Sequence, residues 1–160
     1  MVGAELTTFS RIQPVIESFS ASVTHMGPVG SGQATKAVNQ VIVAGVAEAV
    51  CEALALAEQL NLPRERLLSV LSSGAADSWF LRHRGVSMLD DRFDKGFKQS
   101  LLLKDLKIVH TLARELDISM PVVDSAIRDY TALVACGEGD NDISGLIRHK
   151  RAKKDLKEGH

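Results

Sequence analysis

A long helix that is apolar almost all the way round constrains the fold of this chain more than any other segment. The helical pattern runs from about residue 32 to residue 60, and nonpolar side chains face nearly every direction over residues 41–57. A surface helix keeps one polar face, so this helix has to be enclosed by others. Four residues interrupt it: Asn39, Gln40, Glu48 and Glu52. We interpret it as a buried core helix that is too polar to span a bilayer.

Helical patterns continue along the rest of the chain. We expect helices over residues 64–71, 77–89, 98–116, 121–136 and 142–157. Asp77 or Ser78 can cap the second of these, and Phe93 and Phe97 are expected to hold the loop over residues 90–97 against the body. The fold class predicted from these patterns is all-α, a helical bundle around the long central apolar helix.

The first 26 residues have a different character. An apolar stripe predicts an amphipathic helix over residues 5–19, weakened by Pro14 inside it. Residues 22–26 are the only segment that favours a strand. A single strand leaves backbone N–H and C=O groups without partners. We therefore expect its partner to lie outside this chain, and the segment to be disordered or recruited into an intermolecular contact.

Composition excludes several classes of function. The net charge is −1, and the only basic cluster, residues 148–154, is interpreted as a solvated helix face rather than a nucleic-acid site. Cys51 and Cys136 lie far apart, and the five histidines show no ligand spacing, so no metal site is expected. The start of the chain lacks a signal-peptide pattern. A reducing cytoplasm is the expected location.

The connection into the central helix is rich in glycine. Gly30-Ser31-Gly32 resembles part of a dinucleotide-binding fingerprint, but Thr35 stands where the third glycine is needed and no βαβ unit follows. The alternatives are a strand-to-helix connector and a ligand-binding bend, since glycine permits close approach of a ligand to the backbone.

Lys36 lies just after this bend. Asn39 and Gln40 share its helix face, because residues three and four apart are neighbours. Burial would lower the pKa of the lysine and suit it to proton exchange with a small oxygen-rich substrate. A solvated lysine beside two surface amides is the alternative interpretation.

A second group of polar residues interrupts the apolar stripe of the helix at residues 98–116. Asp105 falls on this stripe, where an unpaired carboxylate would be costly, so it requires a cation, backbone N–H groups or a helix end as partner. Lys104 is adjacent in sequence and is expected to project about 100° around the helix, toward a different neighbour. Trp79 and Phe80 are interpreted as core or interface aromatics, and Asp142 as a helix cap.

Taken together these segments carry a resemblance. The sequence Gly-Pro-Val-Gly-Ser-Gly-Gln-Ala-Thr-Lys-Ala-Val-Asn-Gln at residues 27–40 resembles the catalytic-lysine segment of the β-hydroxyacid dehydrogenases. That family includes 3-hydroxyisobutyrate dehydrogenase and tartronate semialdehyde reductase and is related to 6-phosphogluconate dehydrogenase. The similarity continues through residues 93–97, Leu103-Lys104-Asp105-Leu106, Pro121 and residues 140–142, and so covers essentially the whole chain.

The resemblance implies a domain layout. In this family an N-terminal Rossmann domain binds NAD or NADP, and an all-α C-terminal domain carries the catalytic lysine and the dimer contacts. Residues 1–26 would then be a remnant of the nucleotide-binding domain, and residues 27–160 the helical catalytic and dimerisation domain. The expected activity is interconversion of a small 3-hydroxy acid and its semialdehyde or oxo acid, and this chain alone is expected to be inactive.

The resemblance also implies roles for individual residues. Lys36 corresponds to the general acid/base, and Lys104 to a residue near the cofactor. The family's amide partner often stands four residues after the lysine as Asn, whereas here Asn39 is three after and Gln40 is four after, so both remain candidates. The residues implied to line the substrate side are Gly30, Ser31, Gly32 and Gln33. A non-catalytic helical oligomerisation module, in which Lys36 is incidental, is the alternative.

Overall fold

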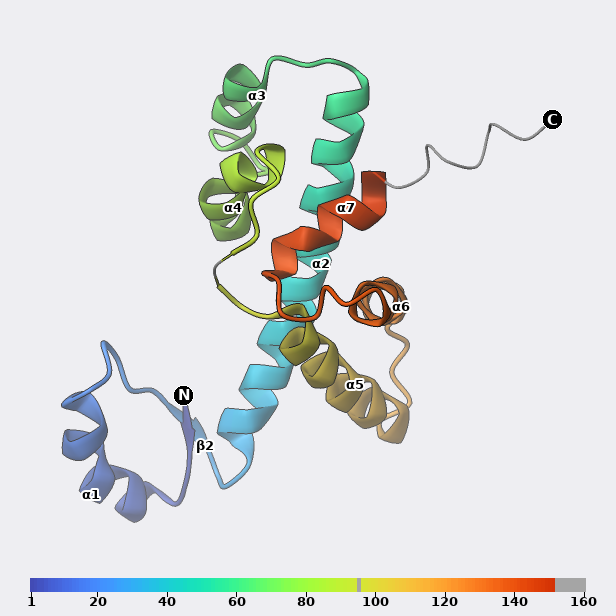
Figure 1. The fold of residues 1–160 in the computed structure, drawn as a ribbon. Helices are drawn as coiled ribbons and strands as arrows, with labels where there is room; N and C mark the ends of the chain where they lie inside the picture. The colour runs from blue at the N-terminus through green and yellow to red at the C-terminus, as the bar shows by residue number, and fades with distance from the viewer. Residues whose placement is uncertain (95, 152–160) are drawn as a thin grey trace.

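The computed structural model describes residues 1–94 and 96–151, and one long helix, α2, forms its axis (Figure 1). The elements in chain order are β1 (Val2–Gly3), α1 (Leu6–Glu17), β2 (His25–Gly27), α2 (Ser31–Gln59), α3 (Arg64–Leu71), α4 (Trp79–Leu89), α5 (Gln99–Glu115), α6 (Pro121–Ala135), the 3-10 turn η1 (Ile143–Gly145) and α7 (Leu146–Arg151). Helices α2 to α6 therefore lie within one or two residues of the ranges that the sequence pattern predicts.

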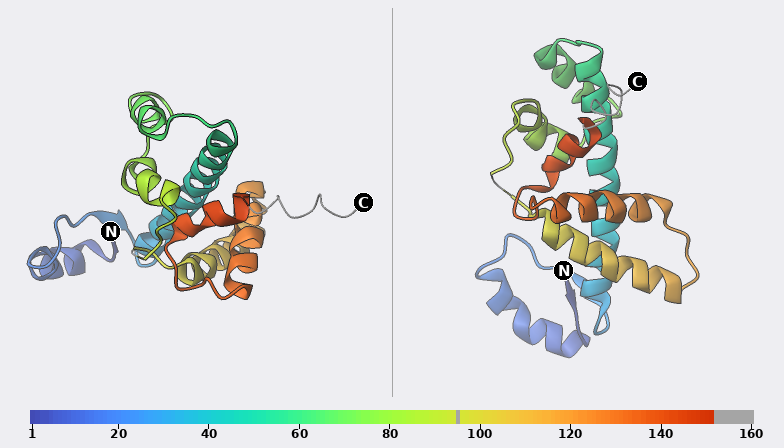
Figure 2. Two further views of the ribbon diagram at one scale, coloured as in Figure 1. Left: turned by 45° about the horizontal axis from the view of Figure 1, so that its top comes forward. Right: turned by 45° about the vertical axis from the view of Figure 1, so that its right-hand side comes forward.

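The other helices pack around α2. Helices α5, α6 and α7 pack against its middle, and α3 and α4 lie beside its C-terminal half, as the two further views in Figure 2 show. Ala44 and Ala47 on α2 are fully buried, because their small side chains let neighbouring helices approach closely. Tyr130 of α6 is also fully buried, and its hydroxyl donates to the Ile143 carbonyl 2.9 Å away. This single bond fixes η1 against α6.

The apolar character of α2 has a second consequence. By length and composition α2 is apolar enough to cross a membrane, so its polar residues alone do not distinguish a core helix from a membrane span. Half of its 18-residue window of mean hydropathy 1.7 is buried inside the protein. Core helices of soluble proteins meet the same criteria.

The N-terminal segment forms a small unit that projects from the lower end of α2 (Figure 1). Strand β2 was expected to lack a partner within the chain, and this is wrong: β1 pairs with it in parallel, with Val2 opposite His25. The Ala4 N–H donates to the Gly27 carbonyl at 2.9 Å. The backbone groups of β2 are therefore satisfied in part by residues that precede α1.

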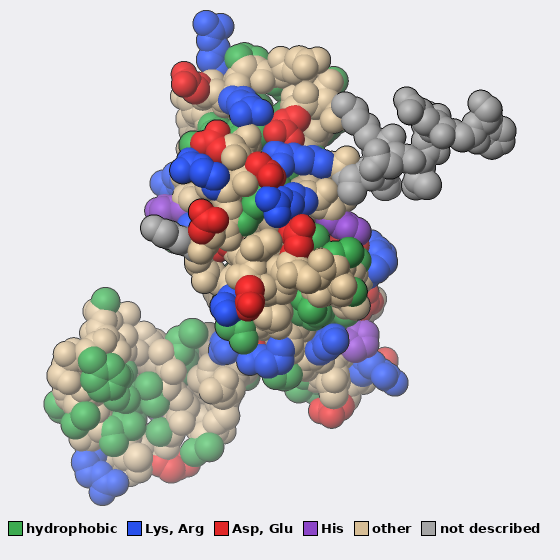
Figure 3. Space-filling view, in the orientation of Figure 1, with side chains coloured by type: hydrophobic (Ala, Val, Ile, Leu, Met, Phe, Trp, Pro, Cys, Tyr) green, Lys and Arg blue, Asp and Glu red, His purple; other side chains and the backbone are tan. Residues whose placement is uncertain are grey.

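Glycines let this unit approach the start of α2. A Cβ atom on Gly3 would lie 2.6 Å from the Pro28 carbonyl oxygen, and one on Gly32 would lie 3.1 Å from the Met1 carbonyl oxygen. The outer side of α1 is not covered in this way. Leu6, Val15 and Phe19 are exposed, and Figure 3 shows hydrophobic side chains gathered over this unit.

The C-terminal part differs from the expectation of one helix over residues 142–157. A 3-10 turn comes first, capped by Asp142, and α7 then extends to Arg151; residues 152–157 of the predicted helix lie outside the described residues. The basic cluster is not simply a solvated face either. The Lys150 side chain is only 11% exposed and pairs with Glu48, Glu52 and Asp129. Because α7 packs against α2 and α6, Lys150 is enclosed in a network of ion pairs instead of being exposed on a helix surface.

Asp142 joins the loop before α5 to α4 and η1. Its carboxylate accepts hydrogen bonds from the Arg84 guanidinium at 3.1 Å, the Phe97 N–H at 3.1 Å, and the Ser144 N–H and hydroxyl. Gly96 lies directly against it with φ of +122°, where a Cβ atom would come 2.0 Å from Asp142 Oδ2. The cap expected from sequence is therefore also the anchor of the loop.

Candidate active site

The carboxylate of Asp105 brings three candidate residues together. Gln40 Nε2 donates to Asp105 Oδ2 at 2.8 Å, and Lys36 Nζ lies 3.4 Å from the same oxygen. Lys104 Nζ lies 3.1 Å from the other oxygen, Oδ1. Lys104 was expected to project toward a different neighbour, and this is wrong, because its long side chain folds back on the adjacent carboxylate. Helices α2 and α5 are thereby linked by two ammonium groups and one amide around one carboxylate.

These contacts determine the charge of Asp105. Its side chain is 9% exposed, and this burial by itself raises the pKa of the carboxyl group. Hydrogen bonds from Gln40 and Lys104 and the charge of Lys36 outweigh burial, so the net pKa of Asp105 is lowered. Asp105 is therefore an anion that holds two cations at the edge of the helical body.

Lys36 itself lies at the surface of this group. Its side chain is 51% exposed, so the strong desolvation that the sequence argument relied on is absent from this chain. The amine is tethered on one side by Asp105 and open to solvent on the other. The Lys36 amine can therefore contact a molecule on its solvent-exposed side while its ion pair with Asp105 restrains its position.

The two candidate amides occupy different positions. Gln40 is buried and its amide is already engaged, because Nε2 donates to Asp105 and Oε1 accepts from Asn39 Nδ2 at 3.2 Å. Asn39 is exposed. A series of contacts therefore links the exposed Asn39 amide through Gln40 and Asp105 to the candidate catalytic amine of Lys36.

The glycine bend borders a hollow beside Lys36. The hollow has a volume of about 270 Å³ and is lined by Met1, Gly3, Gly30, Gly32, Gln33 and Lys36. Gly30 has φ of +97°, a left-handed conformation that favours glycine, and the space where its Cβ would stand is open. Ser31 does not line the hollow; its backbone N–H donates to the Pro28 carbonyl at 3.1 Å. The structure therefore brings three of the four predicted bend residues to Lys36.

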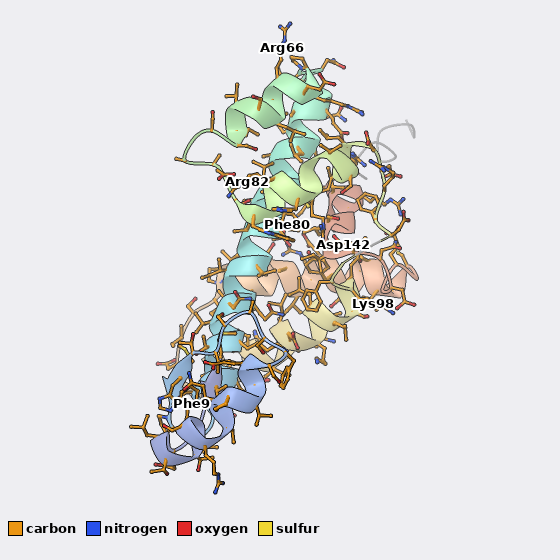
Figure 4. All side chains as sticks on the ribbon, turned by 90° about the vertical axis from the view of Figure 1, so that its left-hand side faces the viewer. Phe9, Arg66, Phe80, Arg82, Lys98 and Asp142 are labelled. Carbon is orange, nitrogen blue, oxygen red and sulfur yellow. The ribbon has the colours of Figure 1, made fainter. Side chains whose placement is uncertain are left out.

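A larger apolar pocket begins at the two amides. It has a volume of about 490 Å³ and is lined by Asn39, Gln40, Ile42, Val43, Val46, Ser78, Trp79, Phe80, Arg84, Phe97, Asp142 and Ile143. Figure 4 shows Phe80 and Asp142 close together beside α2. Trp79 is 59% exposed while Phe80 is buried, so only Phe80 is a core aromatic.

A third hollow follows the outer face of α5. It has a volume of about 440 Å³ and is lined by Ser100, Lys104, Lys107, Ile108 and Thr111. Two ammonium groups and two hydroxyl groups share this face because the residues recur at helical spacing. The surface can bind an anionic or hydroxyl-rich group.

Sequence reasoning left two residues of this arrangement without a site role. Asp105 was singled out as a carboxylate in need of a partner, and the signal was its place on an apolar stripe. Trp79 was interpreted as a core or interface aromatic, and nothing in the local pattern placed it in a pocket with Asn39 and Gln40. Its position depends on how α4 docks against α2, which is a tertiary contact.

Comparison with known proteins shows the family. Residues 30–150 match the family model described as the NAD-binding domain of NADP-dependent 3-hydroxyisobutyrate dehydrogenase. An uncharacterized oxidoreductase of Synechocystis is 36% identical over 151 residues, which cover 94% of this chain and 51% of that protein. The 2-hydroxy-3-oxopropionate reductase of Escherichia coli is 33% identical over 148 residues, which cover 92% of this chain and 51% of that protein.

Solved structures of 3-hydroxyisobutyrate dehydrogenases also resemble this chain. The 3-hydroxyisobutyrate dehydrogenase of Mycobacterium tuberculosis, solved with L-serine, superposes with a TM-score of 0.84 at 29% identity, covering 95% of this chain and 54% of that one. The chain thus spans about half the length of the relatives it matches. It belongs to the family of NAD-binding domains found in NADP-dependent 3-hydroxyisobutyrate dehydrogenases.

Proposed function

We propose that this chain is the lysine-bearing helical part of an NAD(P)-dependent dehydrogenase that interconverts a small 3-hydroxy acid and its semialdehyde or oxo acid. The observation that carries the proposal is the group around Asp105, in which Lys36 and Lys104 meet one carboxylate at the mouth of two hollows. Membership of the family and the names of its relatives, 2-hydroxy-3-oxopropionate reductase among them, support the same reaction class.

Lys36 is the proposed general acid/base. During reduction its ammonium group would donate a proton to the carbonyl oxygen, and during oxidation the neutral amine would accept the hydroxyl proton. Its half-exposed position allows contact with a substrate oxygen, and Asp105 limits the volume that the amine explores. A tethered proton donor lowers the entropic cost of reaching the reacting geometry.

Gln40 and Asn39 have separate proposed roles. Gln40 is the positioning residue for Asp105, because its amide is committed to that carboxylate and is buried. Asn39 has an exposed side chain and is the amide available to a substrate. The division follows from burial, because Gln40 is enclosed and bonded to Asp105 whereas the Asn39 side chain is exposed.

The residues present fit a nicotinamide cofactor along one edge. Lys104 and Lys107, with the Ser100 and Thr111 hydroxyl groups, supply the donors that phosphate, ribose and carboxamide groups require. When bound, the cofactor would supply or accept the hydride. Lys104 and Lys107 would hold that edge of the cofactor. Lys36, which pairs with the other oxygen of Asp105, would deliver the proton.

The whole enzyme requires more than this chain. We propose that residues 1–26 complete a nucleotide-binding domain on their N-terminal side and that the exposed side of α1 packs within it. The 160-residue chain alone should then show no turnover of a 3-hydroxy acid with NAD or NADP. We also propose self-association through the helical body, where Val38, Leu56 and Val122 are exposed. Family membership does not favour the alternative of a purely non-catalytic module.

The test is a matched pair of lysine substitutions in the complete enzyme that contains this chain. Lys36→Ala should lower kcat by at least about 100-fold, the lower end of general acid–base contributions, while cofactor affinity is unchanged. Lys98→Ala is the control, because that side chain is similarly exposed, 53% against 51%, and pairs with Asp140 away from the site. Equal activity of the two variants would refute the proposed role.

A further inference from the structure

The apolar pocket beside Asn39 and Gln40 lies further along α2 than Lys36. Lys36, Gln40 and Val43 share one helix face, and Val43 lies roughly 10 Å along the axis from the lysine at 1.5 Å per residue. Gln40 belongs to both places, since it lines the pocket and donates to the carboxylate that holds Lys36. A molecule whose oxygen contacts Lys36 can therefore place another of its groups in the pocket.

The lining indicates what that group is. Most of the wall is aliphatic or aromatic, and includes Val43, Val46, Trp79, Phe97 and Ile143. The volume of about 490 Å³ falls within the range of roughly 300–1,000 Å³ typical of small-molecule sites. The smallest hydroxy acids would leave most of it unfilled.

The charges in the pocket favour an uncharged group over a second carboxylate. Arg84 lines the wall, but its Nε donates to Asp142 at 3.1 Å, and the Asp142 side chain is only 1% exposed. The guanidinium also lies over the Trp79 ring, 5.4 Å from its centroid. Arg84 is thus paired with a buried carboxylate and lies over an aromatic ring, where it supports the wall rather than attracting an anion.

We infer that the substrate is a 3-hydroxy acid that carries an apolar, preferably aromatic, substituent, and that this pocket binds the substituent. The assignment rests on the proposed function, because the reacting oxygen is placed at Lys36. The Trp79 ring is already stacked by His83, with ring centroids 4.1 Å apart, so Phe97 in the pocket wall is the group against which an aromatic ring would pack. Asn39 lies at the junction, where the polar and apolar parts of such a molecule meet.

Binding to the 160-residue chain tests this directly, since Trp79 is its only tryptophan and reports on the pocket by fluorescence. The ligands are 3-hydroxypropanoate and its 2-methyl and 2-phenyl derivatives, titrated with fluorescence and calorimetry. Each additional buried methylene-sized group strengthens binding about fourfold. We expect the phenyl acid to bind at least roughly tenfold more tightly than the methyl acid. Equal affinity, or no binding of the phenyl acid, would overturn the assignment.

Two valine substitutions localise the effect. Val43→Phe fills the pocket and should abolish the preference for phenyl, whereas Val70→Phe adds the same ring at an exposed position on α3 and should preserve it. Circular dichroism checks that both variants fold. A phenyl preference that survives Val43→Phe would place the substituent elsewhere and overturn the inference.

A third variant separates this inference from the proposed function. Lys36→Ala should weaken all three acids by a similar factor and leave the phenyl-to-methyl ratio intact, because the lysine contacts the part they share. Unchanged affinity for all three acids in Lys36→Ala would refute the proposed function and the substrate assignment with it. A missing phenyl preference, with Lys36 still required, refutes only the pocket assignment.

Discussion

The buried ion network around Lys150 gives the sharpest prediction for stability. Lys150 Nζ lies 2.7 Å from Asp129 Oδ2 and 3.1 Å from Glu52 Oε1, and it also pairs with Glu48. Replacement of Lys150 by Met keeps the length of the side chain but leaves the Glu48 and Asp129 carboxylates, 9% and 6% exposed, without this cation. The variant therefore tests whether α7 is held to α2 and α6 by this one ammonium group.

The expected magnitude follows from the loss of one partner in a buried pair. Such losses typically cost about 3–5 kcal/mol, because the remaining charge is uncompensated. Asp129 retains the Arg128 guanidinium at 3.0 Å, so we expect the lower end, about 3 kcal/mol of unfolding free energy. In a chain of this size that lowers Tm by roughly 10 °C. Lys98→Met, at an exposed pair, is the control and should change stability by less than about 0.5 kcal/mol.

The pH dependence has a defined sign. Burial raises the pKa of Glu48 more than the hydrogen bond from Lys150 lowers it, so the stabilising contribution of Glu48 is present at low pH and is lost as pH rises through its folded pKa. Burial of Asp129 is outweighed by Lys150 and Arg128, which lower its pKa, so its contribution is lost as pH falls through that lowered value.

Removing Lys150 raises the pKa of both carboxyl groups. The deficit of Lys150→Met should therefore be larger at pH 8 than at pH 5, where the carboxylates begin to take up protons. Urea unfolding followed by far-UV circular dichroism at both pH values measures it. A loss below about 1 kcal/mol, or a deficit that grows as the pH falls, would refute the reasoning.

Two further substitutions test the site and its support. Asp105→Asn removes the charge that holds Lys36 and Lys104 while keeping the shape, so kcat/KM of the complete enzyme should fall about 10- to 100-fold with the fold unchanged; a variant with full activity would contradict the role of the carboxylate. Gly96→Ala places a Cβ atom against the Asp142 carboxylate at a positive φ, and should cost at least about 2 kcal/mol in urea unfolding. Gly74→Ala is the control, because a Cβ atom there would meet only the Val70 carbonyl oxygen at 4.0 Å and φ is not in the left-handed region; equal stability of the two variants would contradict the clash.

The helices could be predicted from the sequence because their signals are local. The bounds of α2 follow from an apolar pattern, a glycine bend at its start and Asn61-Leu62-Pro63 after its end. Ser78 caps α4 as its residue type suggests, accepting from the Leu81 N–H at 3.0 Å. Strand β1 was missed because a strand of Val2–Gly3 is too short for any periodicity to show.

The contacts of the site are harder to predict from the sequence, because they join residues of different helices. The need of Asp105 for a partner was visible from its apolar surroundings, yet the identity of that partner depends on how α5 crosses α2. Lys150 looked like one of several surface cations, and only the packing of α7 against α2 and α6 buries it. Patterns along one helix show which face is unusual, whereas pairs such as these are decided by docking between helices.

The most direct measurement of the central claim is chemical rescue of Lys36→Ala in the complete enzyme. If the Lys36 amine transfers the proton, a small amine such as methylamine should restore part of the lost kcat in a concentration-dependent manner, and it should have no effect on Lys98→Ala. A Lys36→Ala enzyme that keeps its full rate without added amine would contradict the claim.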